Sequence, residues 1–103
     1  MIPSDLAEFR AFALRSIDTA TRYLISTAKT AYSTPETGFN EYKTAMFVQT
    51  QLQALGFVVE TGIARTGMKA VLRGAKPGPT IAIIAELDAL RVPEHPGADP
   101  ETG

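Results

Sequence analysis

The chain has 103 residues, 45% of them hydrophobic and 20% charged, a composition typical of one small globular domain. Ten Lys and Arg residues balance eleven Asp and Glu residues, so a formal charge of −1 offers no basic surface for nucleic acid. Without cysteine, and with His95 as the single histidine, the chain lacks a disulfide framework and the ligands of a self-contained zinc site. We therefore expect no nucleic-acid partner and no metal ligands within this chain.

One long amphipathic helix is predicted from Asp5 to Tyr32. Its apolar residues recur at alternating gaps of three and four, which is the period of one helical face. They are Leu6, Phe9, Ala13, Ile17, Ala20, Leu24, Ala28 and Ala31. Ser4 or Asp5 is a suitable N-cap, and Pro35 ends the helix because it disfavours the helical conformation of Thr34.

The same region lacks the pattern of a secretory signal or a membrane anchor. Acidic Asp5 and Glu8 stand where a secretory signal has basic residues. Charges at Arg10, Arg15 and Arg22 interrupt any apolar span of the length that a bilayer requires. We expect a cytoplasmic protein without a membrane partner.

A turn over residues 33–40 leads to a second predicted helix, which has the same spacing of apolar residues. Its apolar face consists of Tyr42, Ala45, Val48, Leu52 and Leu55. Gly56 is the C-terminal stop of this helix. Strands are predicted at residues 57–60 and 68–73, and the breakers in residues 74–79 predict a turn.

Residues 80–85 form a nearly continuous apolar run, which suits a strand covered on both faces of an α/β sheet. Residues 91–103 hold three of the seven prolines and are predicted to be a loop. The predicted fold class is therefore α/β, with two helices and about three strands in an incomplete sheet. The edges of such a sheet need to be covered by a further polypeptide segment.

The strongest candidates for chemistry are Glu86 and Asp88, which follow the apolar run at its carboxyl end. That edge is where open α/β sheets form their sites, and alternation places both carboxylates on one side of a continuing strand. Two neighbouring carboxylates repel unless a cation, a histidine or backbone donors lie nearby, which points to a metal or acid/base site. The alternative is that both face water and cap the next turn. His95 is interpreted as a solvated loop histidine.

Five segments between about residues 30 and 90 carry a family resemblance by their order. They are Thr-Pro-Glu-Thr-Gly-Phe-Asn-Glu-Tyr-Lys-Thr, Leu-Gly-Phe-Val-Val-Glu, Arg-Thr-Gly-Met-Lys-Ala-Val-Leu-Arg-Gly, Lys-Pro-Gly-Pro-Thr and Ala-Glu-Leu-Asp-Ala-Leu. The chain resembles the N-terminal part of the metal-dependent amidohydrolases of the aminoacylase and zinc-carboxypeptidase family. The most similar branch contains indole-acetyl-amino-acid hydrolases, N-acyl-amino-acid hydrolases and aminobenzoyl-glutamate hydrolases.

The resemblance implies that residues 1–103 are the N-terminal fragment of an α/β/α zinc-peptidase-like catalytic domain. The whole enzyme is then a homodimer with a divalent metal pair, zinc or manganese, whose bound water attacks the amide of an N-acyl amino acid or peptide. Asp88 matches an aspartate that orients the metal ligands, and Glu86 matches the acidic position two residues earlier.

Several departures from the family bear on activity. Tyr32 stands where the family often has histidine before the Pro-Glu pair, and Arg91 replaces the proline of Asp-Ala-Leu-Pro. The metal-binding motif His-x-Cys-Gly-His is expected shortly after Gly103, so residues 91–103 are the proline-rich loop at a truncated end. We expect the isolated chain to be inactive and to hold no metal.

Two other interpretations stay open at this point. The chain could be a small non-catalytic α/β module that binds a protein partner through its open sheet edge. Alternatively, a complementary polypeptide supplies the remainder of the fold and the metal site.

Overall fold

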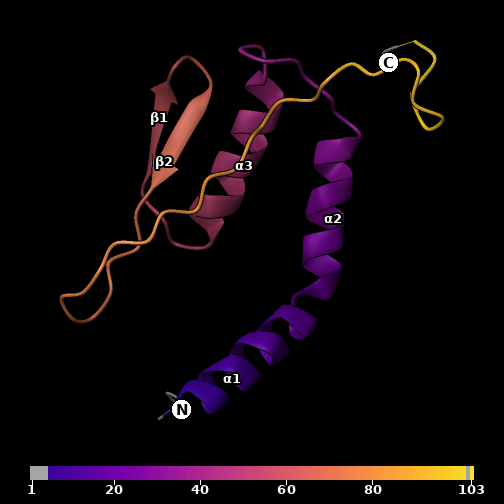
Figure 1. The fold of residues 1–103 in the computed structure, drawn as a ribbon. Helices are drawn as coiled ribbons and strands as arrows, with labels where there is room; N and C mark the ends of the chain where they lie inside the picture. The colour runs from indigo at the N-terminus through magenta and orange to yellow at the C-terminus, as the bar shows by residue number, and fades with distance from the viewer. Residues whose placement is uncertain (1–4, 102) are drawn as a thin grey trace. The chain divides into compact units, whose positions relative to one another are not determined.

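The structure is a computed structural model that describes residues 5–101 and 103, and these contain three helices and a two-stranded sheet (Figure 1). The elements are α1 (Leu6–Thr19), α2 (Thr21–Tyr32), α3 (Tyr42–Ala54), β1 (Val59–Ile63) and β2 (Gly67–Ala70). The chain divides into two compact units, Met1–Ser33 with α1 and α2, and Thr34–Gly103 with α3 and the sheet. This is a small α/β fragment, as the sequence predicts.

The first unit differs from the prediction because the long helix is interrupted at Ala20, where ψ is 0°. Asp5 caps α1 as predicted, since its Oδ1 accepts a 2.8 Å hydrogen bond from the Glu8 amide, whereas Ser4 lies outside the described residues. Near the break, three hydroxyl groups donate to carbonyl oxygens four residues earlier. They belong to Ser16, Thr19 and Thr21. Hydrogen bonds of this kind are common in bent helices, but Thr30 in α2 and Thr50 in α3 make them without a break. The one predicted helix is therefore two in the structure, and these bonds accompany the break without explaining it.

The second predicted helix is confirmed as α3, and its end has a regular C-terminal geometry. Gly56 has φ of +89°, a left-handed conformation that glycine adopts without steric cost. Beyond it, the Phe57 amide donates to the Leu52 carbonyl oxygen at 3.1 Å. This turn directs the chain from α3 into β1.

The antiparallel hairpin pairs Val59 with Ala70 and Thr61 with Met68, and its register shifts between Thr61 and Ile63. Its strands lie near the predicted ones but are displaced toward the turn. At the turn, a Cβ added to Gly67 would lie 2.6 Å from the Ile63 carbonyl oxygen, so only glycine fits there. The tight approach explains why pairing extends to residues 63 and 67.

The predicted third strand at residues 80–85 is not formed, so the structure has two strands where about three were expected. Residues 71–92 contain neither helix nor strand. Ile81, Ile83 and Ile84 are 85%, 96% and 91% exposed, and no hydrophobic residue is buried among those that the structure describes. A strand exists only with a hydrogen-bonded neighbour, and this segment has none in the described part of the chain.

None of the described helices is long and apolar enough to cross a membrane.

Candidate functional site

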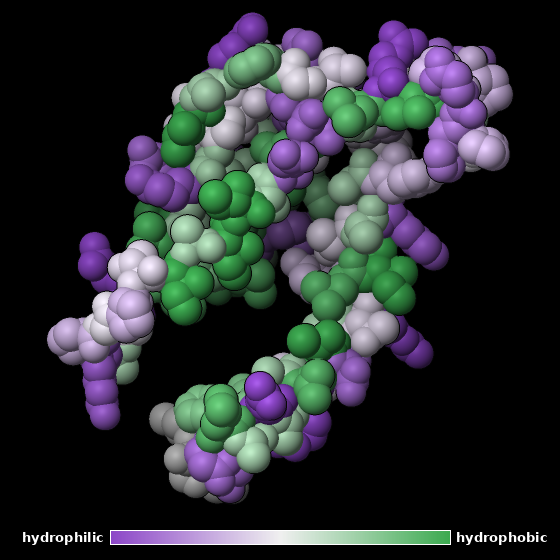
Figure 2. Space-filling model, viewed as in Figure 1, coloured by the Kyte–Doolittle hydropathy of each residue, from purple (hydrophilic) through white to green (hydrophobic). Residues whose placement is uncertain are grey.

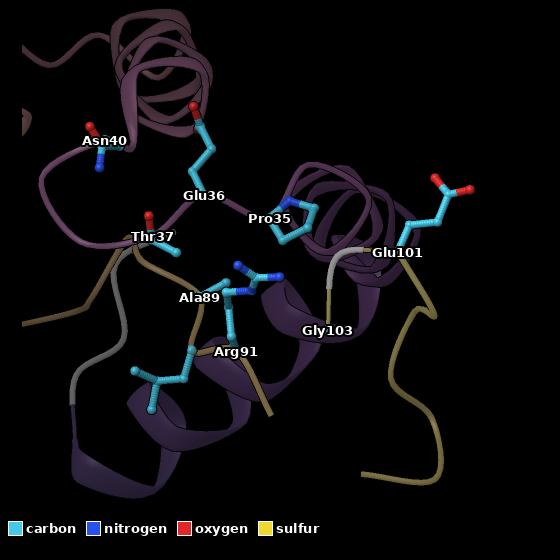
Figure 3. Close-up of a pocket in the computed structure, with 9 residues that line it drawn as sticks. Pro35, Glu36, Thr37, Asn40, Ala89, Arg91, Glu101 and Gly103 are labelled. Atoms are coloured by element: carbon cyan, nitrogen blue, oxygen red, sulfur yellow. The ribbon is translucent and has the colours of Figure 1, made fainter. Parts of the chain in front are cut away.

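The candidate site lies in the second unit, where the loop before α3 meets the segment that carries Asp88. The Ala89 amide donates a 2.8 Å hydrogen bond to the Glu36 carbonyl oxygen and joins the two segments. A cleft of about 420 Å³ lies beside this contact (Figure 3). Its lining residues are Pro35, Glu36, Thr37, Asn40, Ala89, Leu90, Arg91, Glu101 and Gly103.

Glu36 caps the N-terminus of α3 with its carboxylate. Its Oε1 accepts from the Thr44 amide and the Thr44 hydroxyl, both at 2.6 Å, and its Oε2 accepts from the Lys43 amide at 3.0 Å. These amides belong to the second and third residues of α3 and lack partners within the helix. Figure 3 shows the Glu36 side chain directed toward the helix and away from Ala89.

The same hydrogen bonds determine the charge state of Glu36. Burial raises the pKa of this half-buried carboxyl, but the hydrogen bonds from Thr44 and Lys43 outweigh burial, so the pKa lies below its usual value. An ionised carboxylate that already accepts three hydrogen bonds is a poor proton acceptor. Glu36 is therefore suited to fixing structure rather than to acting as a general base.

A second glutamate in this loop connects α3 to the hairpin. The Glu41 Oε2 accepts a 2.7 Å hydrogen bond from the Thr66 hydroxyl, and this bond lowers the pKa of Glu41. Glu41 is only 7% exposed. Neither Glu36 nor Glu41 was predicted as a site residue, and the one sequence signal for either is the Pro-Glu pair ahead of the helix.

The two predicted carboxylates lie in the irregular segment that follows the apolar run. Glu86 and Asp88 are both exposed, and no strand aligns their side chains. Asp88 lines a groove of about 980 Å³, whereas Glu86 does not. The other walls of the groove come from the loop before α3, from α3, from the hairpin, and from residues 82–85 and 87. Figure 2 shows apolar side chains gathered where this segment passes the hairpin. Asp88 thus lies at the edge of an apolar groove.

His95 takes part in a local turn. Its Nδ1 accepts a 3.0 Å hydrogen bond from the Gly97 amide, and the side chain is exposed. In residues 5–101 and 103, no group of three or more His, Asp or Glu side chains could hold a metal ion. The metal pair that the resemblance implies therefore does not fit a site made from these residues alone.

Comparison with known proteins shows that the sequence of this chain is similar to those of several hydrolases. The chain is 36% identical over 74 residues to the thermostable carboxypeptidase 1 of Saccharolobus solfataricus, covering 71% of the chain and 19% of that protein. It is 35% identical over 81 residues to the N-acyl-L-amino acid amidohydrolase of Geobacillus stearothermophilus, covering 79% and 22%. It is 32% identical over 66 residues to the IAA-amino acid hydrolase ILR1-like 6 of Arabidopsis thaliana, covering 64% and 14%.

These relatives confirm the resemblance seen in the sequence to the aminoacylase and carboxypeptidase family of amidohydrolases. The chain spans between 14% and 22% of the length of these relatives. No family model and no solved structure matches the chain.

Proposed function

We propose that the chain acts as part of a longer amidohydrolase that cleaves the amide bond of an N-acyl amino acid or a short peptide. The observation that carries the proposal is the 35% identity over 81 residues to an N-acyl-L-amino acid amidohydrolase. Relatives named carboxypeptidase and deacetylase widen the substrate class to peptides and acetylated amino acids. In this protein, Asp88 would orient metal ligands, as the family resemblance implies.

We also propose that the enzyme uses a divalent metal, zinc or manganese, whose ligands lie outside the described residues. The support is chemical, because a zinc site needs three or four donors and the described residues offer no cluster of three. For the same reason we propose that residues 1–103 alone have no hydrolase activity.

The test compares the whole protein with the isolated chain. Both would be purified, supplied with zinc or manganese, and assayed for free amine released from a panel of N-acetyl amino acids and blocked dipeptides. We expect turnover by the whole protein, loss of turnover with EDTA, and none from the isolated chain. Absence of hydrolysis by the metal-loaded whole protein across the panel would refute the proposed function. Turnover by the isolated chain would refute its proposed inactivity.

A non-catalytic module is the second candidate, and the exposure of Ile83 at 96% favours it. An extended peptide that paired with residues 80–85 would cover this run by adding a strand. Saturable binding of extended peptides by a whole protein without hydrolase activity would support this candidate. The cytoplasmic location and the homodimer are proposals as well, and cell fractionation and light scattering would test them.

A further inference from the structure

Glu36 connects two segments of the second unit, the start of α3 and the backbone at Ala89. Its carboxylate accepts hydrogen bonds from the Thr44 amide and hydroxyl and from the Lys43 amide, at the start of α3. Its carbonyl oxygen accepts the 2.8 Å hydrogen bond from the Ala89 amide, directly after Asp88. The side chain and the backbone of one residue therefore bind two different segments.

A backbone hydrogen bond joins the segment that carries Asp88 to the loop before α3. Residues 71–92 contain no helix or strand, so no ladder of hydrogen bonds fixes the backbone around Asp88. The bond between Ala89 and Glu36 anchors that backbone to the loop before α3. The loop is in turn fixed because the α3 amides hold the Glu36 carboxylate, whose negative charge suits a helix N-terminus.

We propose that Glu36 is a positioning residue for Asp88. The N-terminus of α3 holds the Glu36 carboxylate, and the Glu36 carbonyl oxygen in turn fixes the position of the backbone next to Asp88. The inference rests on the proposed amidohydrolase function, in which Asp88 orients metal ligands. Groups that orient metal ligands typically change metal affinity or activity by about 10- to 100-fold when they are removed. Loss of the hydrogen bonds to the Glu36 carboxylate should therefore displace Asp88 and lower the reaction rate.

The test uses the whole protein and measures the hydrogen exchange of the Ala89 amide together with kcat. The variants are Glu36→Ala, Glu36→Gln and Thr44→Val, which remove all or some of the bonds at the start of α3. Glu60→Gln is the matched control, because Glu60 is 61% exposed and pairs with Lys69 on the hairpin. We expect Glu36→Ala to accelerate Ala89 exchange at least about 10-fold and to lower kcat about 10- to 100-fold. The control should change neither quantity.

A double-mutant cycle with Asp88→Asn separates positioning from general damage to the fold. If Glu36 acts through Asp88, Glu36→Ala should lower kcat less than about 2-fold further in the Asp88→Asn protein. A purely structural role would instead give the same fold-loss in both backgrounds. That outcome, or unchanged Ala89 exchange in a folded Glu36→Ala protein, would overturn the inference.

The milder variants keep the inference testable if Glu36→Ala does not fold. Thr44→Val removes one hydrogen bond and Glu36→Gln removes the charge, so both should accelerate Ala89 exchange by smaller factors. Unchanged exchange in both variants would overturn the inference. Because exchange is measured without substrate, it also decides the positioning question if the whole protein proves to lack hydrolase activity, an outcome that defeats only the proposed function.

Discussion

The exposed isoleucines predict how the isolated chain behaves in solution. Ile81, Ile83 and Ile84 are 85%, 96% and 91% exposed. Full burial of one such side chain stabilises by about 1.5–3 kcal/mol, so covering all three would contribute about 4–8 kcal/mol per chain. Two chains that bury these runs against each other would gain about 8–16 kcal/mol, which is similar to the cost of about 4–15 kcal/mol for association.

We therefore expect residues 1–103 alone to associate or aggregate with a steep dependence on concentration. Ile83→Ser with Ile84→Ser removes about two thirds of the gain and should shift the chain to monomer. Val58→Ser is the control, because Val58 is 90% exposed but lies outside the run. Sedimentation velocity over a range of concentrations is the assay. A monodisperse unmodified monomer, or a double variant that associates as strongly as the parent chain, would refute this reasoning.

Three further predictions concern stability and would be measured on the whole protein. The pKa of Glu36 is lowered on folding, so its ionised carboxylate stabilises the folded state by about 1 kcal/mol above the usual carboxyl pKa of 4.5, and this stabilisation is lost as the pH falls through the folded pKa. The melting temperatures of the parent and Glu36→Gln proteins should therefore converge in acid. A difference in melting temperature that persists in acid would contradict this prediction. Glu60→Gln removes an exposed ion pair and should change the unfolding free energy by less than about 0.5 kcal/mol in denaturant titrations. A loss above about 1 kcal/mol would contradict the conclusion that this ion pair contributes little to stability. Gly67→Ala places a Cβ 2.6 Å from the Ile63 carbonyl oxygen and should destabilise the folded state by about 1–3 kcal/mol. Gly78→Ala is the control, because a Cβ added there meets nothing within 4 Å. Equal melting temperatures for the two variants would refute the steric argument.

Local patterns were sufficient for some elements of this fold. Apolar spacing and Gly56 located α3, and Asp5 was one of the two predicted caps of α1, because both signals act over one or two helical turns. The break at Ala20 was missed because the apolar period continues across it. The spacing of apolar residues reports which face of a helix is apolar, and it does not report whether the backbone is continuous.

Long-range features escaped prediction for a different reason. The cap on α3 comes from Glu36, eight residues before Thr44, which is beyond the reach of local capping patterns. The strand expected at residues 80–85 needs a neighbour, and hydrophobicity alone does not provide one. Asp88 was expected at a strand end and instead follows an irregular segment anchored by Ala89. Such features depend on which segments meet, and a linear pattern does not contain that information.

The interruption at Ala20 changes the cooperativity of the first unit. It leaves helices of 14 and 12 residues, and an isolated helix shorter than about 12–15 residues is marginal in water because each must nucleate separately. Neither helix has a buried residue, so packing adds little to either. A continuous helix over the same residues would nucleate once. The helices α1 and α2 therefore form and melt less cooperatively than one helix of the same total length would.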